Sequence, residues 1–227
     1  MVGTADAGMA MTAVAGHTIG TRTFLVLCLL AWLGWLGVRA YAFGTRPVVS
    51  VAVVLALLVP ALWTEIRWLR VQSAATTAVQ QLTGNPTARV QCQRALDTFL
   101  WAGADLGRVQ WDEPDRAWLT LETCQHLGSW YRSDHEEPTL DEAIAVHVLT
   151  HEAMHVAGDR NEATTECRAL QNDARTVVLL GGSPEQGSAL AERIATEVYP
   201  TMSEEYRTSE CRPGGALDLT PEDGSWP

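Results

Sequence analysis

Residues 139–158 read TLDEAIAVHVLTHEAMHVAG, and they specify the helix around which the rest of the domain is predicted to be arranged. Thr139 and Glu142 form the pattern of a capping box directly after Pro138, so the helix is expected to begin near Leu140. Gly158 can take the left-handed conformation that ends a helix. Apolar residues recur between these limits with helical spacing: Leu140, Ile144, Val148, Leu149, Met154 and Val156.

The last two turns of this helix carry His151, Glu152 and His155 in an HExxH motif. Histidines four residues apart lie on one face of a helix, so both rings can reach one Zn²⁺ at about 2.0–2.1 Å. Glu152 then stands beside the open position of the metal, where a general base acts on water. A catalytic zinc site takes a third protein ligand. Glu162 and Glu166, one turn apart on a second predicted helix, are the candidates.

Asn161-Glu162-Ala-Thr-Thr-Glu166 resembles the run that completes the HExxH site in the gluzincin branch of the zinc metallopeptidases. The resemblance covers about residues 147–170. It implies that Glu162 is the third ligand and that Glu166 orients a ligand histidine, or replaces Glu162 as the ligand. The short connection is closer to the metzincin layout, HExxHxxG, in which Asn161 occupies the ligand position.

The resemblance also implies a minimal zincin-like domain, in which an edge strand of a sheet binds extended peptide. The candidate for this edge strand lies in the predicted hairpin, around Trp118–Leu121. Tyr199 or Tyr206 is expected to donate a hydrogen bond to the oxyanion, as tyrosines do in some zincins.

Simpler interpretations of the same residues stay open. Asp159 and Glu162 fit a capping box, in which Glu162 would only serve the helix. Asp159 is either a third ligand or, as we favour, a cap of the second helix. His147 stands one turn before His151, and we expect an ordinary core or solvated histidine there. The remaining histidines, His17, His126 and His135, have no ligand spacing with the motif.

Residues 23–38 and 47–63 carry no charge, and each run is long enough to span a bilayer. A short Arg-flanked loop joins them, so we expect a helical hairpin with both chain ends on one side of the membrane. The alternative is a cleaved signal segment ending at Ala40-Tyr41-Ala42. The predicted organisation is an N-terminal tail (1–22), a transmembrane hairpin (23–63), a stalk (64–87), a metal-binding domain (88–212) and a flexible C-terminal tail (213–227).

Four cysteines outside the membrane segments indicate the compartment of the domain: Cys92, Cys124, Cys167 and Cys211. An even set fits two disulfides in an oxidising compartment, with the pairing open, whereas four reduced buried cysteines are the alternative. All basic residues are arginine, which favours a GC-rich bacterial genome. We therefore expect a multi-pass protein of a bacterial cell membrane with its catalytic domain on the extracytoplasmic side.

Charge divides along the chain. Residues 1–70 contain five Arg and two acidic residues, Asp6 and Glu65, so their net charge is +3. The net charge of the whole chain is −11, and residues 71–227 therefore carry −14. Such an acidic domain disfavours nucleic acid as a partner. The expected partners are membrane lipid and a peptide or protein substrate, and the oligomeric state is not specified.

The remaining pattern predicts an α+β, mainly helical fold with a small β-hairpin. Helices are expected over 88–101, over 162–180 and from Pro184, after the N-cap Ser183, to Tyr199-Pro200; strands are expected over 108–111 and 117–121. The sequence as a whole favours a membrane-anchored zinc metallopeptidase. The alternatives are a membrane-tethered binding or scaffold domain with structural or no zinc, and a zinc amidase acting on cell-wall amides.

Overall fold

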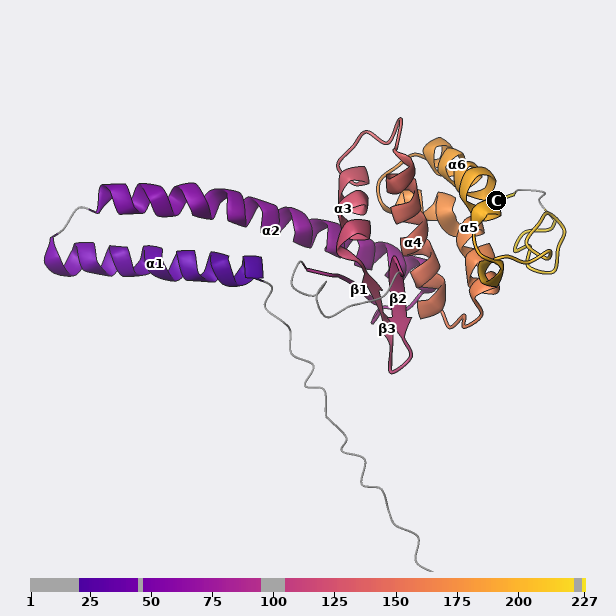
Figure 1. The fold of residues 1–227 in the computed structure, drawn as a ribbon, viewed down its shortest axis with the longest axis horizontal. Coiled ribbons are helices and arrows are strands. Elements are labelled where there is room, and N and C mark those ends of the chain that lie inside the picture. Colours follow the sequence, from indigo (N-terminus) through magenta and orange to yellow (C-terminus); the bar gives the residue numbers. More distant parts are fainter. Residues whose placement is uncertain (1–20, 45–46, 95–104, 223–225) are drawn as a thin grey trace, which may run out of the picture.

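Two long apolar helices form an antiparallel hairpin that extends away from the rest of the molecule (Figure 1). The computed structural model describes residues 21–44, 47–94, 105–222 and 226–227. Helix α1 (Thr21–Phe43) meets the first half of α2 (Val48–Thr83) along a narrow seam of aliphatic side chains: Val26, Leu29, Leu36, Val54 and Leu58. Many other large apolar side chains of the hairpin are exposed. Both helices are long and apolar enough to cross a membrane, in line with the two apolar spans of the sequence.

Helix α2 continues without a break from the hairpin into the domain. The expected stalk, residues 64–87, is helical as far as Thr83, and Gly84 ends the helix with a φ of +68°. The last turns of α2 belong to the main hydrophobic core, where Val71, Ala75 and Val79 are buried. The core therefore begins well before residue 88, and the hairpin and the domain share one helix.

A buried ion pair lies at the base of the hairpin. Glu65 on α2 is 6% exposed and pairs with Arg94 at 3.0 Å. Thr23 on α1 donates to Glu65 at 2.7 Å and accepts from Arg94 at 2.9 Å. These contacts link α1, α2 and the segment that contains Arg94. Separating them would leave a buried charge without a partner, which is unfavourable.

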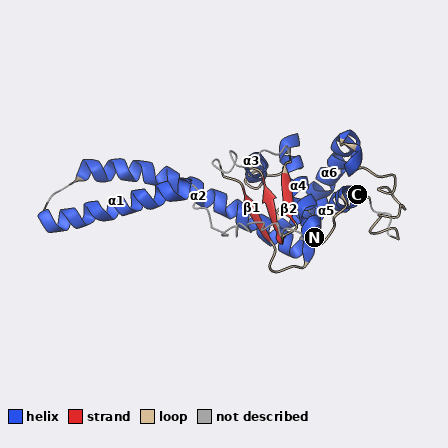
Figure 2. Ribbon diagram, turned by 60° about the horizontal axis from the view of Figure 1, so that its bottom comes forward, coloured by secondary structure: helices blue, strands red, loops and turns tan. Residues whose placement is uncertain are grey.

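A three-stranded sheet follows α2 (Figure 2). Strand β1 (Arg89–Cys92) pairs in parallel with β3 (Glu113–Leu119), and β3 pairs antiparallel with β2 (Gly107–Gln110), in the order β1-β3-β2. The predicted hairpin is confirmed, although β3 begins earlier than expected.

Two predictions about this region are wrong. The helix expected over 88–101 begins as strand β1, because Val90 and Cys92 alternate into the core with the period of a strand; residues 95–101 lie outside the described residues. Of the expected edge strand, Trp118–Leu121, the first two residues belong to β3, which lies in the middle of the sheet, and Leu121 begins the next helix. Within the described residues, β2 is the edge strand of the predicted hairpin.

Four helices complete the domain: α3 (Leu121–Trp130), α4 (Leu140–Val156), α5 (Glu162–Leu179) and α6 (Pro184–Arg193). Helix α4 is buried along most of its length and contacts α2, α3, α5 and the strands β2 and β3. A π-helical turn (Ile194–Val198) and two 3₁₀ turns (Tyr199–Thr201 and Glu204–Tyr206) lead towards the C-terminus. The fold is mainly helical with a small sheet, and the predicted helices at α4, α5 and α6 are confirmed, whereas α3 was not predicted.

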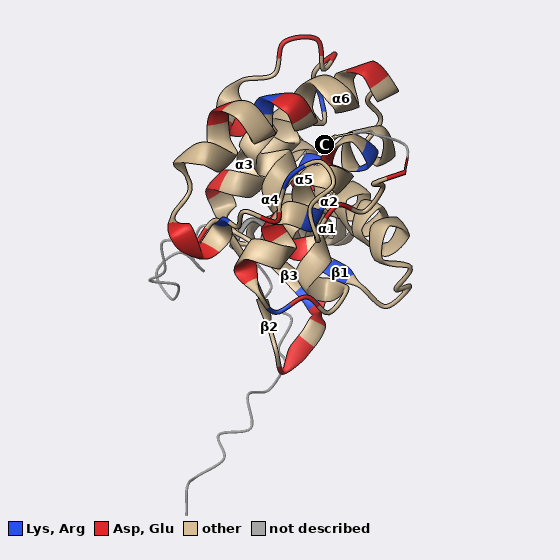
Figure 3. Cartoon of the chain, turned by 90° about the vertical axis from the view of Figure 1, so that its right-hand side faces the viewer, with Lys and Arg blue, Asp and Glu red and all other residues tan. Residues whose placement is uncertain are grey.

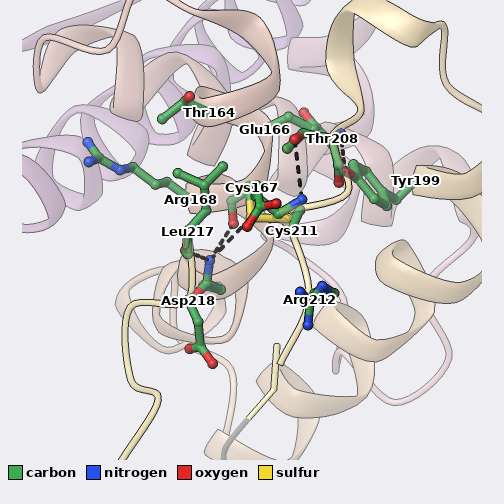
Figure 4. Close-up of a disulfide and its surroundings, with 12 residues drawn as sticks. Thr164, Glu166, Cys167, Arg168, Tyr199, Thr208, Cys211, Arg212, Leu217 and Asp218 are labelled. Carbon is green, nitrogen blue, oxygen red and sulfur yellow. Dashed lines mark hydrogen bonds between the residues drawn. A yellow bond between two sulfur atoms is a disulfide. The ribbon is translucent and has the colours of Figure 1, made fainter. Parts of the chain in front are cut away.

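Two disulfides join distant parts of the domain. Cys92–Cys124 links β1 to α3, and Cys167–Cys211 links α5 to the C-terminal segment (Figure 4). The predicted pair of disulfides is confirmed, and the structure gives its connectivity. The segment expected as a flexible tail is also attached to α5, because Gln171 donates to the carbonyl of Leu217 and accepts from the amide of Leu219.

Acidic residues are distributed over the helices and turns of the domain (Figure 3). Many of them are exposed. The negative charge of residues 71–227 is therefore spread over the surface, apart from a group of acidic side chains that lies inside, between α4 and α5.

Candidate metal centre

The end of α4 and the start of α5 are joined by a tight turn that brings their side chains together. The capping box at the start of α4 is present as predicted: Thr139 accepts from the amide of Glu142 at 3.2 Å, and the Glu142 carboxylate accepts from the amide of Thr139 at 2.9 Å. Gly158 takes a φ of +111°, which a residue with a side chain rarely adopts. Asn161 then caps α5 by accepting from the amide of Thr164. HExxH, in the last turns of α4, therefore faces the first turn of α5.

Three side chains converge on one point between these helices: His151, His155 and Glu162. Their ligand atoms all lie within 4.8 Å of one another. Glu162 Oε2 is 3.2 Å from His151 Nε2 and 3.3 Å from His155 Nε2. A tetrahedral zinc ion with bonds of about 2.0–2.1 Å holds its ligand atoms about 3.3 Å apart. The residues present therefore fit Zn²⁺ with two imidazole nitrogens and one carboxylate oxygen.

The second nitrogen of each histidine is held by an acceptor. His151 Nδ1 lies 2.8 Å from Glu166 Oε2, and His155 Nδ1 lies 2.8 Å from the backbone oxygen of Asp159. A carbonyl and an ionised carboxylate only accept, so both Nδ1 atoms carry a hydrogen, and the two Nε2 atoms, which face Glu162, are the ring nitrogens left to bind a metal. Burial would raise the pKa of Glu166, but His147 and His151 outweigh it and lower the pKa to about 2.

Glu152 is a buried carboxylate beside this point. Its side chain is almost inaccessible, and its Oε2 has no hydrogen-bond partner among the described residues. Burial raises the pKa of Glu152 to about 8, with further contributions from Glu162 and Asp105 and an opposing one from His151. A carboxyl group with such a pKa can both accept and donate a proton near neutral pH.

Strand β2 crosses directly over Glu152. A Cβ added at Gly107 would lie 2.7 Å from Glu152 Oε1, closer than any ordinary contact. Only glycine lets the backbone pass the carboxylate without a shift. Strand β2, the edge strand within the described residues, is thereby brought next to the candidate base.

Aromatic side chains border the site. Trp111, in the turn after β2, meets His155 edge-on at 5.8 Å, and the guanidinium of Arg160 lies 4.8 Å from the Trp111 ring. The Tyr206 ring lies 5.8 Å from His151. Burial and the nearby Glu162 carboxylate raise the pKa of Tyr206 to about 12, so its hydroxyl keeps its proton.

The C-terminal segment places Tyr206 there. Cys211 holds this segment to α5 next to Glu166, as Figure 4 shows. The other candidate tyrosine is engaged elsewhere, because the Tyr199 hydroxyl accepts from the amide of Thr208 at 3.1 Å and donates to its carbonyl at 3.4 Å. Of the two tyrosines, Tyr206 is therefore the one beside the histidines.

Several sequence-based expectations are corrected here. Asp159 does not cap α5, because Asn161 directly precedes the helix and takes that position; the Asp159 carboxylate instead pairs with Arg168. The capping role considered for Glu162 is also wrong, since its carboxylate faces both histidines. His147 is a core histidine, as expected.

Sequence reasoning missed two residues of this region. Gly107 lies at the start of a strand, and a glycine in a strand pattern signals a close approach of another group. Asp173 lies seven residues after Glu166 on α5, a spacing that puts both on one helix face. Neither signal could be used without knowing which element packs against which.

Comparison with known proteins adds nothing to this geometry. No protein-family model, curated protein or solved structure matches the chain. The interpretation of the site rests on the arrangement of its own residues, in which two imidazoles, one half-exposed carboxylate and one buried carboxylate surround a single point.

Proposed function

We propose that this chain is a membrane-anchored, zinc-dependent peptidase with a zincin-like domain. One observation carries the proposal: a single carboxylate oxygen of Glu162 lies 3.2 Å and 3.3 Å from the Nε2 atoms of the two HExxH histidines. The contacts of the two histidines support it, because each Nδ1 has an acceptor of its own and each Nε2 faces this point. The buried carboxylate of Glu152 stands beside the same point.

Each residue then has a chemical role in peptide hydrolysis. Zn²⁺ held by His151, His155 and Glu162 supplies Lewis-acid activation of water and of the scissile carbonyl. Glu152 accepts the proton of the attacking water and returns it to the leaving amine, for which a pKa of about 8 is well placed.

Further contacts position the substrate. The Tyr206 hydroxyl donates a hydrogen bond to the developing oxyanion. An extended peptide lies along β2, the edge strand within the described residues, next to Glu152, and pairs with it by strand addition. Strand β2 thus takes the role that the sequence assigned to the neighbouring strand of the hairpin.

The membrane segments and disulfides support the location. In this proposal α1 and the first half of α2 cross a bacterial membrane, and the two disulfides favour an extracytoplasmic domain because disulfides persist in oxidising compartments. HExxH lies at the end of α4, outside both apolar helices. The substrate is therefore a peptide segment outside the bilayer.

The test uses the purified full-length protein in detergent micelles and a library of quenched fluorescent peptides. We expect hydrolysis that a chelator abolishes and added Zn²⁺ restores. Glu152→Gln should retain zinc but lose activity, whereas Glu192→Gln, which removes an exposed carboxylate on α6, should behave as the wild type. Stoichiometric zinc without hydrolysis of any peptide would favour a binding domain with structural zinc.

A further inference from the structure

A second histidine lies behind the candidate metal centre, one helical turn before His151. His147 is 2% exposed, and both of its ring nitrogens meet carboxylates. Its Nδ1 is 2.7 Å from Asp173 Oδ2, and its Nε2 is 2.8 Å from Glu166 Oε1. The other oxygen of Glu166 meets His151 Nδ1 at 2.8 Å. Asp173, His147, Glu166 and His151 therefore form one unbroken chain of hydrogen bonds that ends at the HExxH motif.

The partners of His147 fix its protonation. An ionised carboxylate can only accept a hydrogen bond, so a ring with a carboxylate at each nitrogen donates from both and carries a positive charge. Burial would lower the pKa of His147, but Asp173 and Glu166 outweigh it and raise the pKa well above its ordinary value. His147 thus lies between two buried carboxyl groups, of which Glu166 has its pKa lowered, whereas burial raises the pKa of Asp173.

Packing alone does not explain this arrangement. Asp173 is 0% and Glu166 1% exposed, so every member of the ion cluster has lost its hydration, and apolar side chains of similar volume usually give equal or greater stability. One turn further along the same two helices the polar contact is neutral: the hydroxyls of Thr150 and Thr176 share a hydrogen bond of 2.8 Å. This chain of hydrogen-bonded ionisable groups therefore indicates a functional role at the HExxH motif, where it ends.

We propose that His147 and Asp173 are positioning residues of the metal centre and act through Glu166. This inference rests on the proposed function, because it concerns the same site. His147 holds one oxygen of Glu166 so that the other faces His151 Nδ1, and both oxygens of this carboxylate are thereby engaged away from the point where Glu162 meets the two Nε2 atoms. Asp173 in turn holds the His147 ring. The choice of Glu162 over Glu166, which the sequence leaves open, is then made by His147.

The test compares His147→Gln, Asp173→Asn and Thr176→Val in the full-length protein in detergent micelles. Thr176→Val is the matched control, because it removes an equally buried hydrogen bond between α4 and α5 on a side chain that is not part of the chain of ions. Zn²⁺ affinity is measured by competition with a chromophoric chelator, and the ligand geometry by the visible spectrum of the Co²⁺-loaded protein. We expect about 10- to 100-fold weaker Zn²⁺ binding in His147→Gln, a smaller loss in Asp173→Asn and altered Co²⁺ spectra in both, with wild-type values in Thr176→Val.

Wild-type affinity and spectrum in a folded His147→Gln variant, or an equal loss in Thr176→Val, would overturn the proposal. If His147→Gln does not fold, Asp173→Asn decides: weaker Zn²⁺ binding with an altered Co²⁺ spectrum is expected, and wild-type values in this variant would overturn the proposal. A folded wild type that binds no Zn²⁺ overturns the proposed function together with this inference, whereas a zinc-binding wild type with unaffected variants overturns the inference alone.

Discussion

The molecule buries charge in two places, and the two are built differently. At the base of the hairpin, the described residues place one carboxylate, Glu65, against one guanidinium, Arg94, at 3.0 Å. Between α4 and α5, the described residues place four carboxylates around three imidazoles: Glu152, Glu162, Glu166 and Asp173 around His147, His151 and His155. Even with every imidazole protonated, the second cluster is one positive charge short.

Among the described residues, the junction near Glu65 pairs opposite charges, whereas the α4–α5 cluster has an excess of carboxylates. In the metal-free protein, burial raises the pKa of Glu152 to about 8, and Glu162 and Glu166 outweigh burial and raise the pKa of His151 to about 9. Both groups therefore hold a proton at neutral pH. A divalent ion at Glu162 would supply the missing charge in place of those protons.

The largest effect is expected when the cluster loses its base. Glu152→Gln should lower peptide hydrolysis by about 10²–10⁴-fold, because general base catalysis contributes that much. The same variant should stabilise the metal-free protein at pH 7 by roughly 3 kcal/mol. The pKa of Glu152 is about 4.5 in the unfolded chain and about 8 in the folded protein. Between these pH values folding requires Glu152 to take up a proton, which costs stability that increases with pH. Gln at this position avoids that cost. Chemical denaturation in the presence of a chelator measures this, and a destabilised variant would contradict it.

Removing one partner of the Glu65–Arg94 pair should destabilise the protein, in contrast to the stabilisation expected for Glu152→Gln. Arg94→Met leaves Glu65 buried without this guanidinium, and we expect a loss of about 2–4 kcal/mol in unfolding free energy. The double variant Glu65→Leu with Arg94→Met should recover most of that loss. Zinc content should stay at the wild-type value in both. A drop in zinc content would show that the two clusters are coupled.

Zinc binding should depend on pH, as expected for a site that exchanges protons for a metal. Burial alone would lower the pKa of His151, but Glu162 and Glu166 outweigh it and raise it to about 9. Zinc must displace this proton, so affinity should fall about tenfold for each pH unit below 9. Chelator competition between pH 8 and pH 6 measures the slope. A flat profile would mean that His151 is not a ligand.

A smaller effect is expected where the edge strand passes the cluster. Gly107→Ala puts a Cβ against Glu152 Oε1 and forces one of them to move. We expect about a tenfold loss in kcat/KM, equivalent to about 1.4 kcal/mol, with zinc content retained. Gly37→Ala, which adds a Cβ with nothing within 4 Å, is the matched control. Full activity in Gly107→Ala would show that β2 does not constrain the base.

Features that depend on neighbouring residues could be predicted from the sequence. The capping box of α4, the end of this helix near Gly158 and the start of α6 after Ser183 depend on neighbouring residues, and all three are present in the structure. The spacing of the HExxH motif depends on one helix only. Such signals are local and can be read without knowing the fold.

The features that escaped prediction depend on contacts between distant segments. Strand β1 is four residues long and pairs with β3, more than twenty residues away, so its helical periodicity was misleading. The pairing of Glu65 with Arg94 and of His147 with Asp173 likewise requires the packing of separate elements. The candidate ligands could be predicted, whereas the groups that hold them could not.

The zinc content of the full-length protein tests the central claim most directly. Elemental analysis of wild type, Glu152→Gln, Glu162→Ala and Arg94→Met should find about one zinc per chain in all but Glu162→Ala, which should lose it while keeping its fold. Folded wild-type protein without zinc, or full zinc retention in Glu162→Ala, would contradict the account of a charge-deficient cluster completed by a metal ion.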